Sequence, residues 1–337
     1  MADAMQEREW LAPFTVDTRL VLSVQGRGRG DPTFHTDETG AIWRTSLTPD
    51  GPATIRVLPG RPVAETAGPA TRVRAQAWGP GAQWLLDGLP GVLGGEDDVS
   101  GFASDAHPVI RDAARRNPGL RLGRSGRLME ALVPAILEQK VVVLEAHRAW
   151  RILLGKYGTQ PPGPAPRGMR VFPDPRTWRR IPSWDWHRAG VEGVRAETII
   201  RAATVADSLE RLLKLTHEEA DRRLRTIPGI GVWTSAEARQ RAAGDPDAVS
   251  VGDYHLKNIV GWALAGKDRS TDEEMLALLE PFRGHRHRAT RLIGLSRGNG
   301  TGQPAGSGSA KVGIARYGTG GPPRRGPRVS VRDYRGF

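Results

Sequence analysis

The sequence predicts an α+β fold, in which an antiparallel β domain over residues 1–105 precedes a helical domain over residues 106–296. Short alternating apolar stretches separated by turn residues fill the first part, and this pattern is typical of antiparallel strands. From His107 onward, apolar residues recur at spacings of three and four, as in amphipathic helices. Residues 297–337 show neither pattern, which predicts a disordered tail.

The predicted strands alternate apolar and polar residues over short distances. They are Arg19–Val24, Ala41–Thr45, Ala53–Leu58 and Val73–Trp78. Turn residues at 37–40 and 49–52 separate them. The even spacing leaves no room for crossover helices, so we expect an antiparallel sheet with one face covered.

The predicted helices follow in the second part of the chain. They are Leu128–Gln139, Val141–Tyr157, Glu192–Val205, Leu209–Lys214 and His217–Leu224. In the first of them, Leu128, Leu132 and Ile136 share one face. The run of prolines over residues 161–166 predicts a loop, because proline lacks an amide donor and fixes φ.

The chain of 337 residues carries 49 Lys and Arg against 37 Asp and Glu, a net charge of +12. Only six of the cations are lysine and 43 are arginine, which favours a polyanionic partner, although a genome-wide arginine bias gives the same composition. Eight cations and one acid lie in the tail, so the tail holds +7 of the charge. It is expected either to contact phosphates or only to aid solubility.

Cysteine is absent, which excludes disulfides, thiolate metal sites and cysteine nucleophiles. No apolar run approaches the ~18 residues that span a bilayer, and residues 1–14 lack the pattern of a signal peptide. We therefore expect a cytoplasmic protein without a membrane partner.

The most specific motif lies over residues 224–235, where the first helix ends near Arg225 and a second begins near Trp233. Between them, Pro228-Gly-Ile-Gly231 reverses the chain. Gly231 has no Cβ, so the amides of the second helix are open to a phosphate oxygen. This is the chemistry of a helix-hairpin-helix DNA contact, although any tight turn between two helices has the same pattern.

Asp253 follows Gly252 and precedes an apolar segment with helical spacing. By itself it is a natural N-cap for that helix. Together, the hairpin and the Gly-Asp-Tyr segment resemble the helix-hairpin-helix DNA glycosylase superfamily, in particular the 3-methyladenine DNA glycosylase II branch, over residues 108–293. The resemblance implies that residues 106–296 form a glycosylase domain. It also implies a double-stranded DNA partner with a damaged, alkylated base. We further expect a nucleoid-associated location and a monomer.

By this resemblance Asp253 is the catalytic carboxylate, which stabilises the positive charge on the sugar as the N-glycosidic bond breaks. Trp233 occupies the position where strand-nicking members carry a lysine. Because tryptophan forms no imine, the enzyme is expected to be monofunctional; Trp233 also fits simple core packing. The residues expected to contact DNA are Gly229, Gly231, Val232, Thr234, Gln139, Lys140, His255 and Lys257.

Two parts of the expected site depart from the family pattern. Lys140 replaces a bulky apolar wedge, so it is expected to contact phosphate, fill the gap with its aliphatic stem, or be solvated. Glu237 and Arg291 replace aromatic residues of the base pocket that Trp233 completes. Glu237 is expected either to contact the base or to pair with Arg291.

The resemblance also suggests one bound ion and no other cofactor. A monovalent cation is expected on the backbone carbonyls of Arg225, Ile227 and Gly229. The basic run 285–288 is expected to contact the DNA backbone or be solvated. The alternative to a glycosylase is a non-enzymatic DNA-binding protein with a degenerate base pocket.

Overall fold

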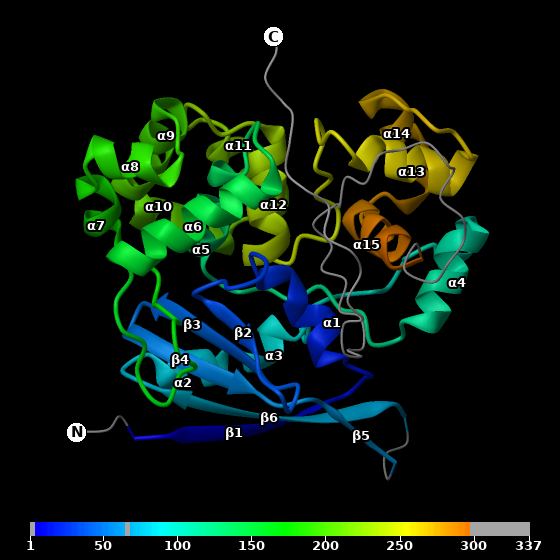
Figure 1. The fold of residues 1–337 in the computed structure, drawn as a ribbon. Helices are drawn as coiled ribbons and strands as arrows, with labels where there is room; N and C mark the ends of the chain where they lie inside the picture. The colour runs from blue at the N-terminus through cyan, green and yellow to red at the C-terminus, as the bar shows by residue number, and fades with distance from the viewer. Residues whose placement is uncertain (1–3, 65–67, 297–337) are drawn as a thin grey trace, which may run out of the picture.

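The computed structural model describes residues 4–64 and 68–296, so the predicted tail lies outside the described residues. Figure 1 shows a sheet at the bottom of the molecule and the helices above it. The helical part follows the sheet in the chain, as the α+β prediction requires. No helix within the described ranges is long and apolar enough to cross a membrane.

The sheet contains six strands in the described part, and all of their pairings are antiparallel, which confirms the prediction. The strands are β1 (Gln6–Ala12), β2 (Phe34–Thr36), β3 (Ile42–Thr48), β4 (Gly51–Val57), β5 (Arg61–Val63) and β6 (Ala70–Trp78). Their order is β1-β6-β4-β3-β2, and β5 also pairs with β6.

The strand predicted over residues 19–24 is wrong, because this segment forms α1 (Thr18–Leu22) and η1 (Ser23–Gln25). The Asp17 side chain accepts a hydrogen bond from the Leu20 amide and caps the helix. Val21 and Leu22 are adjacent and both buried, which a strand with one covered face does not allow. The apolar residues therefore pack from one side of a short helix.

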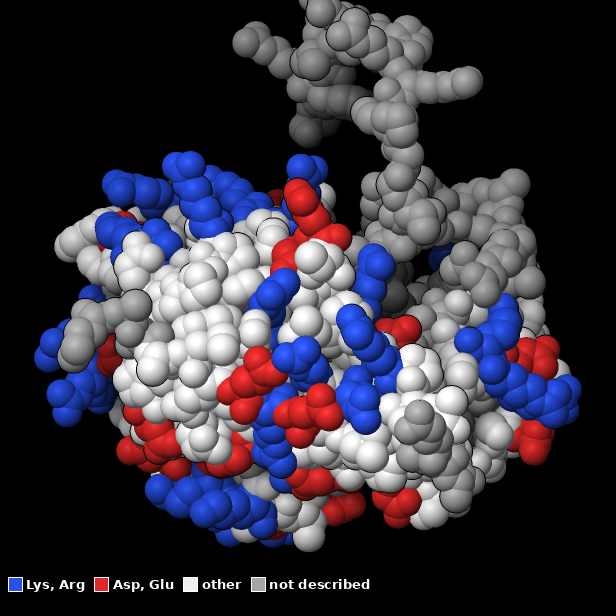
Figure 2. Space-filling model, turned by 90° about the horizontal axis from the view of Figure 1, so that it is seen from below, with Lys and Arg blue, Asp and Glu red and all other residues white. Residues whose placement is uncertain are grey.

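One face of the sheet is covered and the other is lined with charge. The covered face packs against α1, α2 (Ala82–Asp87) and α3 (Leu89–Val92) in an apolar core. Two ion pairs join β1 to β6: Glu7 pairs with Arg74, and Glu9 pairs with Arg72. Figure 2 views the molecule from the side of the sheet and shows blue and red side chains interspersed. This side has no continuous basic surface for a phosphate backbone.

The helical part contains twelve α-helices among the described residues. They are α4 (Pro108–Arg116), α5 (Leu128–Leu137), α6 (Val143–Tyr157), α7 (Pro175–Arg180), α8 (Ser183–Ala189), α9 (Gly193–Thr204), α10 (Ala206–Arg211), α11 (His217–Leu224), α12 (Val232–Ala242), α13 (Leu256–Ala265), α14 (Asp272–Leu279) and α15 (Arg286–Ser296). Short 3-10 turns are η2 (Ser104–Ala106), η3 (Leu212–Lys214) and η4 (Glu280–Phe282). All five predicted helices are present, although the segment 209–214 is divided between α10 and η3.

The helices form two apolar cores. Helices α5 to α12 surround the first, and α5 is apolar on nearly all sides because it lies at its centre. Helix α4 packs with α13, α14 and α15 around the second. The loop over residues 243–255 crosses from one core to the other, and Asp253 lies near its end.

Candidate active site

The hairpin between α11 and α12 contains Gly229, whose backbone conformation requires glycine. The amide of Ile230 donates to the carbonyl of Ile227 at 3.0 Å, which closes the turn. Gly229 has φ of +95°, and a Cβ there would lie 2.1 Å from Thr198 Oγ1. A side chain at this position is therefore excluded by both the backbone conformation and the space.

Gly231 is open. Its φ is −96°, an extended conformation, and a Cβ there would meet no heavy atom within 4 Å. No side chain caps α12, so the amides of Val232 and Thr234 in its first turn have no partner within the helix. The hairpin thus presents uncapped donors at its surface, as the sequence predicted. Thr234 is buried and its Oγ1 accepts from Gln139, whereas Val232 is 39% exposed at the start of the helix.

Gln139 joins the end of α5 to the hairpin. Its Nε2 donates to the carbonyl of Gly229 at 2.9 Å and to Thr234 Oγ1 at 2.8 Å. Glu138, the preceding residue, accepts from Arg27 at 3.2 Å in the interior. Lys140 follows with an exposed side chain and a φ of +53°, the one positive φ of a non-glycine residue in the described part of the chain. The turn therefore holds Lys140 in a strained conformation beside the hairpin.

Asp253 lies opposite the start of α12. Its Oδ2 accepts from Trp233 Nε1 at 3.3 Å, and its Oδ1 accepts from the amides of His255 and Leu256 at 2.8 Å each. The N-cap position of α13 belongs to His255, two residues later than predicted, but the Asp253 carboxylate still bonds the first amides of that helix. The Asp253 carboxylate therefore caps α13 and contacts Trp233 at the same time. It is half-buried.

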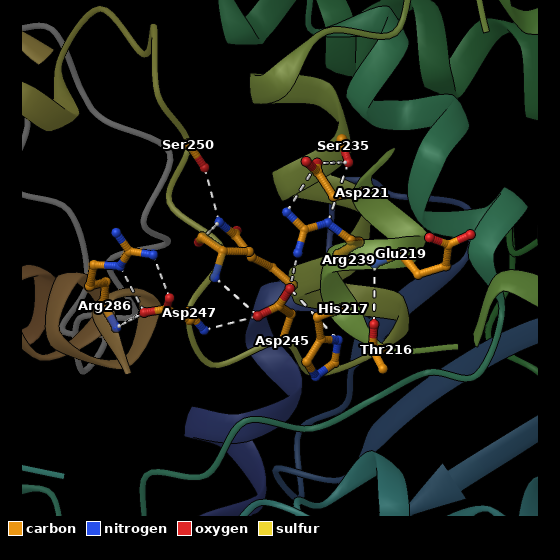
Figure 3. Close-up of polar contacts among 12 residues, drawn as sticks. Thr216, His217, Glu219, Asp221, Ser235, Arg239, Asp245, Asp247, Ser250 and Arg286 are labelled. Atoms are coloured by element: carbon orange, nitrogen blue, oxygen red, sulfur yellow. Dashed lines mark hydrogen bonds and ion pairs between the residues drawn. The ribbon is translucent and has the colours of Figure 1, made fainter. Parts of the chain in front are cut away.

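An ion-pair network ties the loop before Asp253 to the hairpin (Figure 3). Arg239 of α12 lies between Asp221 of α11 and Asp245 of the loop and pairs with both. Ser235 Oγ donates to Asp221 at 2.7 Å, which orients this carboxylate. Further along, Asp247 binds Arg286 of α15. The path of the chain toward Asp253 is thus fixed from both cores.

Glu237 pairs within its own helix. Its Oε2 lies 2.7 Å from Arg241 Nη1, and its Oε1 accepts from Ser250 Oγ at 2.5 Å. Burial raises the pKa of Glu237, but the charge of Arg241 and the two hydrogen bonds outweigh burial, so the pKa lies below its ordinary value. The predicted alternative of a Glu237–Arg291 pair is wrong, because Arg241 is the neighbour one turn along the helix.

The Glu237 side chain is also linked to Asp253. The carbonyl of Ser250, whose hydroxyl binds Glu237, accepts the Asp253 amide at 3.2 Å. Trp233 and Glu237 are one turn apart on α12 and thus face the same loop. Trp233 therefore contacts Asp253 directly and Glu237 reaches it through Ser250, whereas their roles in a base pocket stay predictions.

Arg291 lies half-buried on α15, and no hydrogen bond or ion pair joins its side chain to another described residue. Burial and the charge of Arg241 lower its pKa to about 10. The prediction that residues 285–288 contact DNA or are solvated is wrong for three of the four. Arg286 pairs with Asp247, Arg288 forms a buried pair with Asp97, and His287 is buried.

The remaining predicted contacts are at the surface. Lys257 Nζ lies 3.7 Å from Asp272, and His255 packs edge-on to Tyr254, which is 79% exposed. At the predicted cation site, the carbonyls of Ile227 and Gly229 each accept one hydrogen bond. Each carbonyl oxygen keeps a second lone pair, so the cation on these carbonyls and that of Arg225 stays a prediction.

Sequence reasoning missed several residues of this site. Arg241 is the main one, although its position four residues after Glu237 was a usable signal. Its carbonyl accepts from Gln25, and its Nε donates to the Val24 carbonyl at 3.1 Å. No pattern in the sequence indicates this contact between the N-terminal part and α12.

Curated relatives of the chain are DNA repair proteins, whereas no protein-family profile matches it. It is 24% identical over 201 residues to a DNA-3-methyladenine glycosylase of Bacillus subtilis, covering 58% of this chain and 66% of that protein. It is 29% identical over 159 residues to a probable bifunctional transcriptional activator/DNA repair enzyme AlkA of Mycobacterium tuberculosis, covering 46% of this chain and 31% of that protein. The chain thus matches just under two thirds of the first relative and about a third of the second.

Solved structures with the same fold cover most of the described chain. The 3-methyladenine DNA glycosylase of Archaeoglobus fulgidus has a TM-score of 0.70 at 17% identity, covering 86% of this chain and 98% of that one. The 8-oxoguanine glycosylase/lyase of Clostridium acetobutylicum has a TM-score of 0.64 at 12% identity, covering 88% of this chain and 100% of that one. A structure of the latter enzyme with double-stranded DNA has a TM-score of 0.63.

Proposed function

From the premise that this chain has the fold of the helix-hairpin-helix DNA glycosylase superfamily and 3-methyladenine glycosylases as relatives, we propose that it is a monofunctional DNA glycosylase. It hydrolyses the N-glycosidic bond of a damaged base, with alkylated purines as the class that the relatives indicate, in double-stranded DNA. The observation that carries the proposal is the Asp253 carboxylate held 3.3 Å from Trp233 beside the uncapped start of α12.

The reaction needs little more than a fixed negative charge at the sugar. As the C1′–N bond lengthens, positive charge develops on the sugar, and a carboxylate about 4 Å away stabilises it by ~4 kcal/mol at an effective dielectric of 20. The two amides on Oδ1 and the indole on Oδ2 hold the Asp253 carboxylate in place. The uncapped amides of α12 supply the phosphate contact that keeps the DNA in register.

The test replaces Asp253 with asparagine, which keeps Oδ1 as an acceptor for the α13 amides. We expect Asp253→Asn to lower base release from methylated DNA about a thousandfold, the factor that ~4 kcal/mol gives. DNA binding should be unchanged. Base release at the wild-type rate contradicts the assigned role of Asp253.

A matched control comes from Asp174, which caps α7 through the amides of Arg176 and Thr177. Asp174→Asn makes the same chemical change at a helix start on the far side of the α5–α12 core. It should leave base release unchanged. A loss of activity in both variants would mean that capping, rather than catalysis, explains the effect at Asp253.

The absence of a lyase step follows from Trp233, since no lysine occupies this hairpin position. Lys140 is an exposed amine that follows Gln139, which bonds to the hairpin, and it is a candidate for a Schiff base. Borohydride treatment of the protein with abasic DNA should therefore trap no covalent adduct. An adduct lost in Lys140→Arg would establish a bifunctional enzyme instead.

The second candidate function is a DNA-binding protein without catalysis. The observation that favours it is the Glu237–Arg241 ion pair, which replaces the aromatic pocket expected from the family. It predicts DNA binding with no base release from any lesion. A panel of oligonucleotides with defined lesions separates the two functions.

A further inference from the structure

One face of α12 is hydrogen-bonded along its length to the loop that carries Asp253. Trp233, Glu237 and Gln240 share this face, because they follow one another at spacings of four and three. Trp233 Nε1 donates to Asp253 itself, and the other two side chains bind residues earlier in the loop. Helix α12 thus holds both the carboxylate and the backbone that leads to it.

Ser250 is the residue at which Glu237 and Gln240 meet the loop. It is 4% exposed, and its hydroxyl donates to Glu237 Oε1 at 2.5 Å. Gln240 Nε2 donates to the same hydroxyl oxygen at 3.0 Å and to the Ala248 carbonyl at 2.9 Å. The hydroxyl therefore has a donor and an acceptor from α12, which fixes its orientation.

Ser250 is also the first residue of the turn that ends at Asp253. The Asp253 amide donates to the Ser250 carbonyl at 3.2 Å, which closes the turn. Gly252 has a φ of +87°, the left-handed region that favours glycine. Of the four residues 250–253, only Ser250 is buried. A shift of Ser250 therefore moves the backbone of Asp253 with it.

The remaining hydrogen bonds of this turn are local or longer. Asp253 Oδ1 accepts from amides two and three residues later in the chain, and these move with it. Trp233 of α12 and Asp272 of α14 reach the turn at 3.3 Å and 3.2 Å. Among the described residues, the bond from the Ser250 hydroxyl to the Glu237 carboxylate is the shortest that joins this turn to another element.

The Glu237 side chain is held from the opposite side as well. Its Oε2 lies 2.7 Å from Arg241 Nη1, and Arg241 Nε donates to the Val24 carbonyl at 3.1 Å. Gln25 Nε2 donates to the Arg241 carbonyl at 3.2 Å. Both oxygens of the Glu237 carboxylate are thus used inside the protein, where 13% of the side chain is exposed.

We propose that Glu237 and Ser250 are positioning residues for Asp253. The inference rests on the proposed glycosylase function and names the side chains that set the place of its carboxylate. They act through the turn at 250–253 and need no contact with the substrate. Because a misplacement of about 1 Å lowers the rate at a reacting centre roughly a hundredfold, loss of this hydrogen bond should slow base release without weakening DNA binding.

Single-turnover release of a damaged base tests the proposal. The duplex carries 7-methylguanine, hypoxanthine or ethenoadenine, whichever the wild type releases fastest, and the protein is in excess. We expect Ser250→Ala to lower the rate roughly ten- to a hundredfold, while the Kd for a duplex with an abasic site is unchanged. Glu237→Leu should show the same loss. Glu237→Gln keeps hydrogen-bonding groups of the same shape and should retain most of the rate.

Ser46→Ala is the matched control. Ser46 is buried, and its hydroxyl donates to the Glu130 carboxylate at 2.7 Å, between β3 and α5. The substitution removes the same kind of bond from a buried serine outside the Asp253 loop. It should change the melting temperature about as much as Ser250→Ala and leave the rate of base release unchanged. If Glu237→Leu does not fold, Ser250→Ala and Ser46→Ala decide the question by themselves.

The double variant shows whether Glu237 and Ser250 act through one contact. If they do, the losses of Ser250→Ala and Glu237→Leu do not multiply when the two are combined. A wild-type rate in Ser250→Ala, a parallel loss of DNA binding, or losses that multiply overturn the inference. Release of no base by the wild type overturns the proposed function itself.

Discussion

Replacement of Gly229 by alanine tests whether the hairpin is built as the structure shows. Gly229 has φ of +95°, and an added Cβ would lie 2.1 Å from Thr198 Oγ1 and 2.9 Å from Thr198 Cγ2. Both atoms belong to a β-branched side chain that is fully buried on α9 and donates to the Val194 carbonyl. Thr198 therefore has little freedom to move away.

The loss in the free energy of unfolding on Gly229→Ala has two parts. A non-glycine residue with positive φ costs about 1–2 kcal/mol, and overpacking of a filled site costs about 1–3 kcal/mol. We expect Gly229→Ala to lower the free energy of unfolding by ~2–5 kcal/mol. For a chain of this size, that is a fall in Tm of roughly 4–10 °C.

The assay is thermal unfolding followed by circular dichroism, with Gly231→Ala as the matched control. Gly231 is extended and open, so Gly231→Ala should keep stability within ~0.5 kcal/mol while a methyl group beside the α12 amides weakens DNA binding. Thr198→Ala in the Gly229→Ala background should restore part of the loss. Equal stability of the two glycine variants would refute the steric reasoning.

Two further predictions concern pH and salt. Burial raises the pKa of Glu130 despite Arg127 and Arg44, so the stability that this carboxyl contributes below about pH 4.5 is lost as pH rises through the raised value, and the free energy of unfolding of the wild type should fall relative to that of Glu130→Gln. Urea unfolding at pH 4 and pH 8 measures this, and an equal pH dependence in both proteins contradicts it. Deletion of residues 297–337 removes a charge of +7 and should flatten the salt dependence of DNA binding, reducing the slope of log K against log salt by at most about 6. An unchanged slope means that the tail does not contact phosphate.

The secondary structure was predicted best where the pattern is local. The motif at 224–235 specifies its hairpin because the glycines and the helix ends lie within a few residues of one another. His217–Leu224 was predicted with the observed bounds. The segment 19–24 was misassigned because its alternation fits a strand, whereas the cap at Asp17 and burial of two adjacent residues select a helix.

The sequence did not predict which side chains pair around Asp253. Asp253 and Trp233 were expected together, and the indole donates to the carboxylate. Glu237 was expected to face either the base or Arg291, and it pairs with Arg241. His287 was expected in a solvated or DNA-bound run, although it is buried. Which of several arginines meets a given carboxylate depends on the packing of helices far apart in the sequence, so spacing along the chain does not specify it.

The sequence by itself determined that the chain is α+β, that a glycine-bearing hairpin precedes an aspartate, and that lysine is absent from the hairpin position of Trp233. These features are local, and each follows from backbone sterics or residue chemistry over a few positions. The tertiary structure alone decided that segment 24–25 reaches α12 and that Arg291 has no carboxylate partner among the described residues. Both depend on how the two helical cores and the sheet pack together, because a side chain's partner and burial are set by neighbours that the chain brings near only when it folds.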